Sequence, residues 1–150
     1  MKLTNFTIGA DNISIIPFDD TYLDIHNSYD FEEFSYNTFE QKLKLRWSMT
    51  REEWVKPIVR KEDEIMYVRF ALVFEQINFF TVRERNENLP FSDDTCIEFI
   101  GFSSLDMRNN FDSFLMPTFI KETDDIIICF QSGQVLKINC KFVEFVELFD

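Results

Sequence analysis

Apolar and polar residues alternate along several stretches of this chain, and the longest of these stretches runs from residue 66 to residue 85. Five of its apolar side chains share one parity: Met66, Val68, Phe70, Leu72 and Phe74. A period of two is typical of a β-strand that buries one face, whereas a helix would scatter these residues around its circumference. The pattern predicts that residues 66–85 form the central strand of the fold.

A second amphipathic strand is predicted over residues 38–47. Phe39, Leu43, Leu45 and Trp47 fall on one face, and the basic side chains of this segment fall on the other: Lys42, Lys44 and Arg46. An antiparallel sheet with one solvated face produces this alternation. We therefore expect the sheet to expose one side to water here.

Residues 125–140 have the sequence of a β-hairpin, because two β-rich runs flank Ser132-Gly133. A two-residue loop would pair Cys129 with Leu136 and Ile128 with Lys137. The core face would then hold Ile127, Cys129, Leu136, Ile138 and Cys140. The mixed face would hold Phe130, Val135, Lys137 and Asn139. Cys129 does not lie opposite Cys140 on this register, which argues against a disulfide between them.

The remaining segments also favour strands. We expect two strands before a stop at residues 17–20, one over 21–28, and one over 95–103 that is interior and covered on both faces. Residues 141–149 fit a strand or an amphipathic helix of two turns, and we favour the strand. Residues 29–37 fit a strand or a helical turn, and both interpretations stay open. A capping box at Thr50 and Glu53 indicates one helical turn. We expect a charged turn at residues 61–64 and a polar loop at residues 86–94. Residues 104–124 are expected to form a long connection with a short helical piece.

These elements predict a mainly β protein, an antiparallel β-sandwich or flattened barrel with at most two short helices. At 150 residues the chain is expected to form a single all-β domain over 1–150. Nineteen Phe residues predict a core rich in phenyl rings.

A formal net charge of −12 changes the range of possible partners. Nucleic-acid binding depends on Lys and Arg, so the charge predicts a basic protein partner instead. The charge is uneven: residues 11–40 carry eight acids without a Lys or Arg, and residues 41–61 carry seven bases against two acids. Either these two segments pack against each other within the fold, or they leave a dipolar surface.

Three Cys residues without a signal peptide predict thiols of a cytoplasmic protein rather than a disulfide framework. No stretch reaches the length of apolar sequence that a membrane span needs, so no membrane association is expected.

Catalytic chemistry finds little support in the sequence. The single histidine, His26, lies in a predicted strand without a nucleophile motif nearby. Its spacing from the cysteines does not match a zinc site. Four acidic pairs, at residues 19–20, 32–33, 93–94 and 124–125, occur where turns are predicted, where Asp bonds its own backbone. The prediction is therefore a protein without catalytic residues, metal or cofactor.

The strongest candidate surface is the tract from residue 19 to residue 40, where acids stand beside aromatic side chains. Such a surface would steer toward a cationic partner and bind it through desolvated rings. Alternatively, the rings are core and the acids solvate the outer face. The predicted partner-binding residues are Asp19, Asp20, Asp24, Tyr29, Asp30, Glu32, Glu33 and Tyr36.

The half of the chain from Phe74 to Cys140 resembles the small β-rich immunity proteins with which bacteria neutralise polymorphic toxins. The resemblance rests on Phe74, Phe79, Val82 and Arg83, on Leu89-Pro90-Phe91, on Gly101, and on the spacing Phe130-x-x-Gly133-x-Val135-x-x-Ile138-x-Cys140. It implies a non-enzymatic, cytosolic inhibitor of one toxin domain. Two further hypotheses are an all-β ligand- or carbohydrate-binding module, with a cleft lined by Trp47, Trp54 and tyrosines, and an enzyme with dispersed carboxylates.

Overall fold

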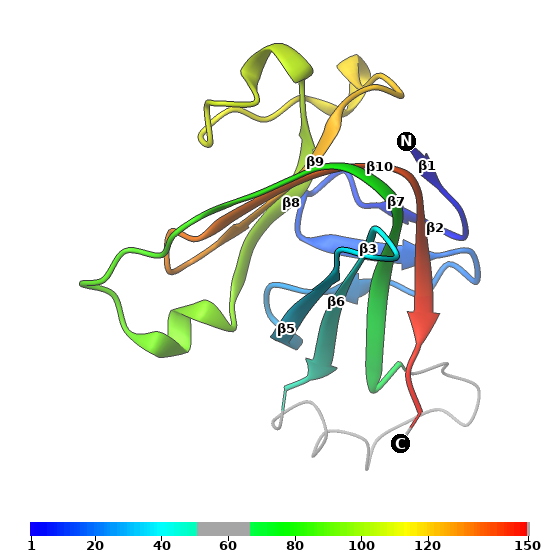
Figure 1. The fold of residues 1–150 in the computed structure, drawn as a ribbon. Coiled ribbons are helices and arrows are strands. Elements are labelled where there is room, and N and C mark those ends of the chain that lie inside the picture. The colour runs from blue at the N-terminus through cyan, green and yellow to red at the C-terminus, as the bar shows by residue number, and fades with distance from the viewer. Residues whose placement is uncertain (51–66, 150) are drawn as a thin grey trace.

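Most of the strand residues belong to one curled antiparallel sheet that forms a half-barrel (Figure 1). The structure is a computed structural model that describes residues 1–50 and 67–149. The sheet has the strand order β5-β6-β7-β10-β9-β8, and β1 pairs in parallel with β10. Its strands are β1 (Lys2–Leu3), β5 (Tyr29–Asn37), β6 (Lys42–Met49), β7 (Arg69–Arg83), β8 (Ile97–Ser103), β9 (Asp125–Phe130) and β10 (Val135–Glu147).

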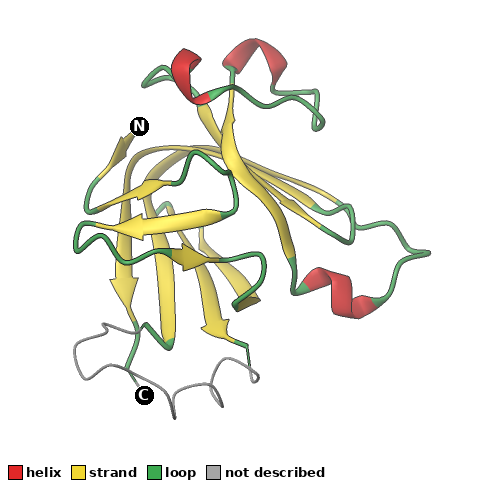
Figure 2. Cartoon of the chain, turned by 180° about the vertical axis from the view of Figure 1, so that it is seen from behind, coloured by secondary structure: helices red, strands yellow, loops and turns green. Residues whose placement is uncertain are grey.

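A smaller antiparallel sheet lies across the half-barrel (Figure 2). It consists of β2 (Phe6–Ile8), β3 (Ser14–Pro17) and β4 (Leu23–Asp24). Phe6, Ile15 and Leu23 from this sheet belong to the same buried cluster as Leu45, Phe70 and other residues of the main sheet. Burial of apolar side chains on both sheets therefore holds the two layers together.

The strand content confirms the predicted mainly β class, since the described residues are 52% strand and 7% helix. Three short 3-10 helices occur in the described ranges, one more than the predicted limit of two: η2 (Phe91–Asp94), η3 (Leu105–Met107) and η4 (Pro117–Phe119). η3 and η4 lie in the 104–124 connection, where a short helical piece was predicted. The capping box at Thr50 and Glu53 and the charged turn at 61–64 extend outside the described residues.

The alternation predicted for the second amphipathic strand is confirmed along β6. Leu43, Leu45 and Trp47 are fully buried, and the basic side chains between them are partly exposed. The prediction was wrong for Phe39, which is 97% exposed. Phe39 lies in the turn between β5 and β6, where the Asn37 side chain accepts the Phe39 backbone N–H, so this residue does not take part in the strand alternation.

The central strand is β7, and its buried residues change phase part-way along. Phe70, Leu72 and Phe74 are buried, as the pattern predicts, but the next buried residue is Ile77. Gln76 between them has a φ of +55°, and the register with β10 shifts between Asn139 and Cys140. Bulges of this kind bend and twist a strand, so β7 and β10 turn together and carry the sheet from the half-barrel into a projecting arm (Figure 1).

The hairpin between β9 and β10 exists, but its predicted register was wrong by one residue. Val135 pairs with Cys129 and Lys137 with Ile127. The loop has three residues, because Gly133 donates its N–H to Phe130 O and Phe130 donates its N–H to Gln134 O. Gly133 adopts a φ of +84°, the left-handed conformation that a three-residue loop requires at this position.

A one-residue shift moves side chains to the opposite face of the sheet. Ile126, Ile128 and Phe130 therefore enter the core, where Ile127 and Cys129 were expected. Ile127 lies on the opposite face, beside Lys137 and Val135.

The other segments follow the predictions in part. Residues 29–37, for which helix and strand were both open, form strand β5. Residues 141–147 continue β10, which confirms the preference for a strand. β4 covers only Leu23–Asp24, so His26 lies in a turn and not in a strand.

β8 is the last strand in the sheet order and not an interior strand. Its open side is covered by loops of the chain, since Ile100 donates its N–H to Asn12 O and Phe102 O accepts the Leu115 N–H.

Candidate functional site

Three of the eight predicted partner-binding residues have structural roles. Tyr29 is 3% exposed and donates its hydroxyl hydrogen to Tyr67 O at 2.6 Å. Asp24 accepts the backbone N–H groups of His26 and Asn27 and so closes a turn. Asp19 accepts hydrogen bonds from the Thr21 N–H and the Tyr67 hydroxyl. Tyr29 therefore belongs to the core, as the alternative interpretation of the tract expected, and Asp19 and Asp24 stabilise loops.

The other acids of the tract divide between two places. Asp20 is exposed in a turn after β3, with a φ of +66°. Asp30, Glu32 and Glu33 follow one another on β5. Partial burial raises the pKa of Asp30. The eight residues therefore do not form one continuous surface, because Asp19, Asp20 and Asp24 belong to the small sheet and the rest to β5.

Glu32 and Glu33 contact the basic segment that follows them in the sequence. Arg46 on β6 lies 2.9 Å from Glu33 and 3.3 Å from Glu32, and Arg69 lies 3.8 Å from Glu32. These pairs are partly solvated, so each contributes at most about 1 kcal/mol to the stability of the fold. For these residues the acidic and basic segments do pack against each other.

The second half of β5 is exposed to solvent along its whole length. Tyr29 and Phe31 are buried, but the nine residues that follow are exposed: Glu32, Glu33, Phe34, Ser35, Tyr36, Asn37, Thr38, Phe39 and Glu40. A register shift between Phe31 and Glu33 inserts one extra residue at the point where burial ends. The bulge separates a core half of the strand from a surface half.

Phe34 and Tyr36 share an exposed cluster with Phe80 of β7. Phe34 pairs with the buried Leu45 and Tyr36 with the buried Leu43, so both rings project from the inner face of the sheet. The Phe80 ring centroid lies 5.9 Å from that of Phe34 and 5.6 Å from that of Tyr36. Exposed aromatic clusters of this kind are frequent at protein-binding surfaces.

This cluster continues along β7 to a cavity at the end of the arm. Phe80 and Val82 pair with Ile138 and Leu136, which are core residues, so they share the inner face. Val82 also lines an open cavity of about 630 Å³. The other lining residues are Glu84, Arg85, Glu87, Phe91 and Gln134.

Phe91 is 79% exposed, and the Arg85 guanidinium lies over its ring at 4.5 Å. We call Phe34, Tyr36, Phe80, Val82 and Phe91 the aromatic strip. Glu84 and Glu87 border the strip at the cavity, whereas Glu33 precedes Phe34 in the chain but pairs with Arg46 on the opposite face of β5.

Sequence reasoning identified only Tyr36 of this strip as a binding residue. Val82 and Phe91 were noted for the family resemblance, but no local pattern joins them to Tyr36. Residues 86–94 were predicted as a polar loop. The one aromatic side chain in that loop, Phe91, was the feature of the sequence that could have indicated a binding residue there. Only the curl of β7 brings these positions together.

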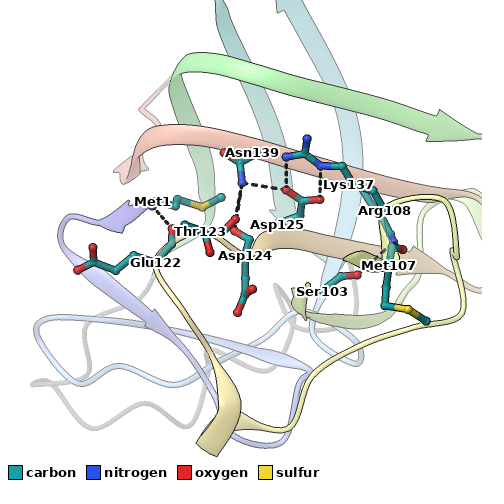
Figure 3. Close-up of polar contacts among 10 residues, drawn as sticks. All are labelled: Met1, Ser103, Met107, Arg108, Glu122, Thr123, Asp124, Asp125, Lys137 and Asn139. Atoms are coloured by element: carbon teal, nitrogen blue, oxygen red, sulfur yellow. Dashed lines mark hydrogen bonds and ion pairs between the residues drawn. The ribbon is translucent and has the colours of Figure 1, made fainter. Parts of the chain in front are cut away.

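A buried polar cluster lies on the outer face of β9 and β10 (Figure 3). Lys137 is fully buried and donates to Ser103 Oγ at 3.1 Å and to the carbonyls of Met107 and Asn110 at 2.7 Å. Burial lowers the pKa of Lys137. An ammonium has three donors; one bonds Ser103 at the end of β8, and the other two hold the 104–124 connection against the sheet. This arrangement is structural rather than catalytic.

Asp125 lies in the same cluster and is also fully buried. Its carboxylate accepts two hydrogen bonds from Arg108 and one from Asn139 Nδ2 at 2.8 Å. The hydrogen bond to Asp125 raises the pKa of Arg108. The chain terminus joins the same region, because the Met1 amino group donates to Glu122 O.

His26 and Cys96 come close together, which the sequence did not predict. Cys96 Sγ lies 3.8 Å from His26 Nδ1, but this nitrogen also lies 2.6 Å from Ile97 O. A nitrogen that donates to a carbonyl cannot accept the thiol proton. Burial, and then the charges of Asp30, Asp93 and Glu98, raise the pKa of Cys96. The pair therefore lacks the thiolate that a nucleophilic cysteine needs.

A second cavity of about 410 Å³ lies beside Cys129. Four phenylalanines line it, Phe99, Phe111, Phe114 and Phe130, together with Arg83 and other residues. Trp47 does not line a cleft, since it is fully buried and stacks on Phe70, so the tryptophan-lined cleft proposed for a carbohydrate-binding module was wrong for this residue. Trp54 lies outside the described residues.

Within residues 1–50 and 67–149, no group of three or more His, Cys, Asp or Glu side chains is arranged to hold a metal ion. In the same residues, no helix has the length and hydropathy to cross a membrane. Comparisons with protein-family models, curated proteins and solved structures give no match to this chain. Functional inference therefore rests on the geometry described above.

Proposed function

We propose that this chain is a non-enzymatic, cytosolic binding protein of the immunity type, which neutralises a basic toxin domain by contacting it through the aromatic strip and its acidic borders. The observation that carries this proposal is the exposed Phe34–Tyr36–Phe80 cluster beside the surface half of β5. Rings that are held in place by the sheet lose little conformational freedom on binding, and desolvated aromatic side chains dominate binding energies at interfaces.

Charge supports a cationic partner. The chain carries −12 overall, and Glu33, Glu40, Glu84 and Glu87 are exposed near the strip. Long-range attraction of this kind raises association rates and weakens as salt screens it. The acids of the small sheet, Asp19 and Asp20, would contribute to the field without touching the partner.

The test begins with capture of the partner by the tagged protein in its native host, followed by identification of the partner by mass spectrometry. The captured domain is then produced in a bacterium with and without this chain, and growth is measured. We expect growth to be arrested by the domain alone and restored by the chain. A captured partner that is acidic, or a basic partner without toxicity, would contradict the proposal.

Two variants locate the contact. Phe34→Ser combined with Tyr36→Ser should weaken binding at least about tenfold, whereas Phe119→Ser is the matched control, because Phe119 is 67% exposed but lies on the 104–124 connection. Glu84→Lys combined with Glu87→Lys should slow association about tenfold at low salt and less at high salt. Equal effects of the strip variant and the Phe119 control would remove the strip from the interface.

A ligand-binding module is the second candidate, because the 410 Å³ cavity has the size and the phenyl lining of a small-molecule site. Co-purification of a small molecule, lost on Phe99→Ser, would favour this function over protein binding.

A further inference from the structure

Among residues 1–50 and 67–149, one edge of the main sheet is open along its surface half, and the other is covered by loops. β5 and β8 are the first and last strands of the sheet order. Loops of the chain bond the open side of β8 at Ile100 and Phe102. On β5, the described part of the chain makes the same kind of contact near the buried end, where Phe31 donates its N–H to Thr95 O at 2.8 Å. Beyond the bulge, β6 is the only strand of the described chain that pairs with β5.

The register shows which backbone groups of β5 face outward. Met49 on β6 donates its N–H to Val68 O, toward the β7 side of the strand. Residues alternate along an antiparallel strand, so Leu43, Leu45 and Trp47 also face β7 and Lys44 faces β5. Lys44 pairs with Ser35. Ser35 therefore bonds to β6, and the N–H and C=O groups of its neighbours Phe34 and Tyr36 point away from the sheet.

We propose that the surface half of β5 accepts an additional antiparallel β-strand from a basic protein partner, bonded through the backbone of Phe34 and Tyr36. This inference rests on the proposed function and specifies how that partner binds. Exposed strand edges are templates for such pairing, and main-chain hydrogen bonds then supply affinity while alternate side chains supply specificity.

The two faces of β5 define the sequence that the added strand would carry. Phe34 and Tyr36 lie on the inner face with Phe80, so inward residues of the added strand would be apolar. Glu32 and Glu33 both lie near Arg46 on the outer face, because the bulge places two residues opposite one. Outward residues of the added strand would therefore be Lys or Arg.

A second copy of this chain does not fit the same edge. β5 has the sequence YDFEEFSYN, with three acids and without a Lys or Arg. Two such strands side by side would bring the acids of both copies together, and Arg46 and Arg69 already pair with Glu32 and Glu33 of their own chain. Like charges opposite each other are destabilising across a strand pair. The occupant must bring its own positive charge.

The test uses an eight-residue peptide of alternating valine and lysine, with an equal peptide of valine and glutamate as the control, and measures binding by backbone amide NMR. We expect the lysine peptide to bind and to slow hydrogen exchange of the Phe34 and Tyr36 amides, and the glutamate peptide not to bind. Absence of lysine-peptide binding at millimolar concentration, or protection of other amides instead, would overturn the proposal.

Two substitutions at one position separate the backbone from the ring. Tyr36→Ala removes the ring and keeps the N–H, whereas Tyr36→Pro removes both. Proline is tolerated on an edge strand when its position faces solvent, so the fold should survive, which thermal unfolding checks. We expect Tyr36→Pro to weaken lysine-peptide binding at least about tenfold more than Tyr36→Ala. Equal affinities of the two variants would overturn strand addition.

The same pair of variants distinguishes this inference from the proposed function. If the captured partner binds Tyr36→Pro and Tyr36→Ala equally, strand addition is wrong and the binding function stands. If the lysine peptide protects the β5 amides but no basic toxin is captured, strand addition at β5 is correct and the immunity function is wrong.

Discussion

Arg108 donates two hydrogen bonds, each 2.9 Å long, to the fully buried carboxylate of Asp125. The two residues are 17 positions apart, and the pair fixes the start of the 104–124 connection to the first residue of β9. The guanidinium also lies over the Phe79 ring at 4.0 Å. Because the carboxylate is fully buried, its hydrogen bonds come from Arg108 and Asn139 and not from bulk water.

Arg108→Met should therefore destabilise the protein by about 3–5 kcal/mol, since it leaves a buried charge without its partner. The control is Lys42→Met, which removes a solvated pair with Glu75 and should cost about 0–1 kcal/mol. Chemical denaturation measures both. Similar losses in the two variants would contradict the buried role of Asp125.

Alkaline pH should destabilise the fold through its buried thiols and one phenol. Burial raises the pKa of Cys140 to about 12 and that of Cys129 to about 11, from an ordinary value of 9. Burial and then the hydrogen bond to Asp19 raise the pKa of Tyr67 to about 12. Each raised pKa means that the folded state favours the neutral form, so the stability it contributes is complete below pH 9 and is lost between pH 9 and 12.

The measurement is the free energy of unfolding from pH 8 to pH 11. Cys129→Ala with Cys140→Ala should flatten the fall, even though the double variant is less stable at every pH because it loses buried volume. Tyr67→Phe should flatten only the part above pH 10. An unchanged slope in the cysteine variant would show that other groups cause the loss.

Cys96 should react slowly with alkylating reagents near neutral pH. Its pKa is raised by burial and by three nearby acids, so little thiolate is present. Iodoacetamide labelling at pH 7.5, followed by mass spectrometry, should be much slower than for a free cysteine, and His26→Gln should leave the rate unchanged. Fast labelling that depends on His26 would instead indicate a working Cys–His pair.

Gly133→Ala should cost about 1–2 kcal/mol, because the residue adopts a φ of +84°. An added Cβ would lie 3.6 Å from Asn86, an ordinary contact, so the cost is one of backbone conformation and not of space. Gly133→Asn should cost less, since Asn tolerates the left-handed region. Equal losses for Ala and Asn would argue against the three-residue loop.

Local alternation predicted much of the fold, because burial of one sheet face is visible within a single strand. Leu43, Leu45 and Trp47 on β6 and Phe70, Leu72 and Phe74 on β7 are inward as predicted. The register of the hairpin between β9 and β10 could not be predicted from local alternation. Ser132-Gly133 is compatible with loops of two or three residues, and the hydrogen bonds of Phe130 with Gly133 and Gln134 distinguish them.

The candidate site was predictable only in part, because it depends on contacts between distant strands. Tyr36 lies in the predicted tract, but its neighbour Phe80 is 44 residues away along the chain. Their contact requires the bend near Gln76, where a non-glycine residue takes a φ of +55° that the sequence does not announce. The acids of the tract were separated for the same reason, since β3, β4 and β5 carry them to different layers.

β7 and β10 each run unbroken through the half-barrel and the arm, with twelve residues of each paired to the other. Neither half can lose its order without fraying a strand that the other half shares. We therefore expect the molecule to melt as one cooperative unit, with heat and denaturant giving coincident transitions by every spectroscopic probe.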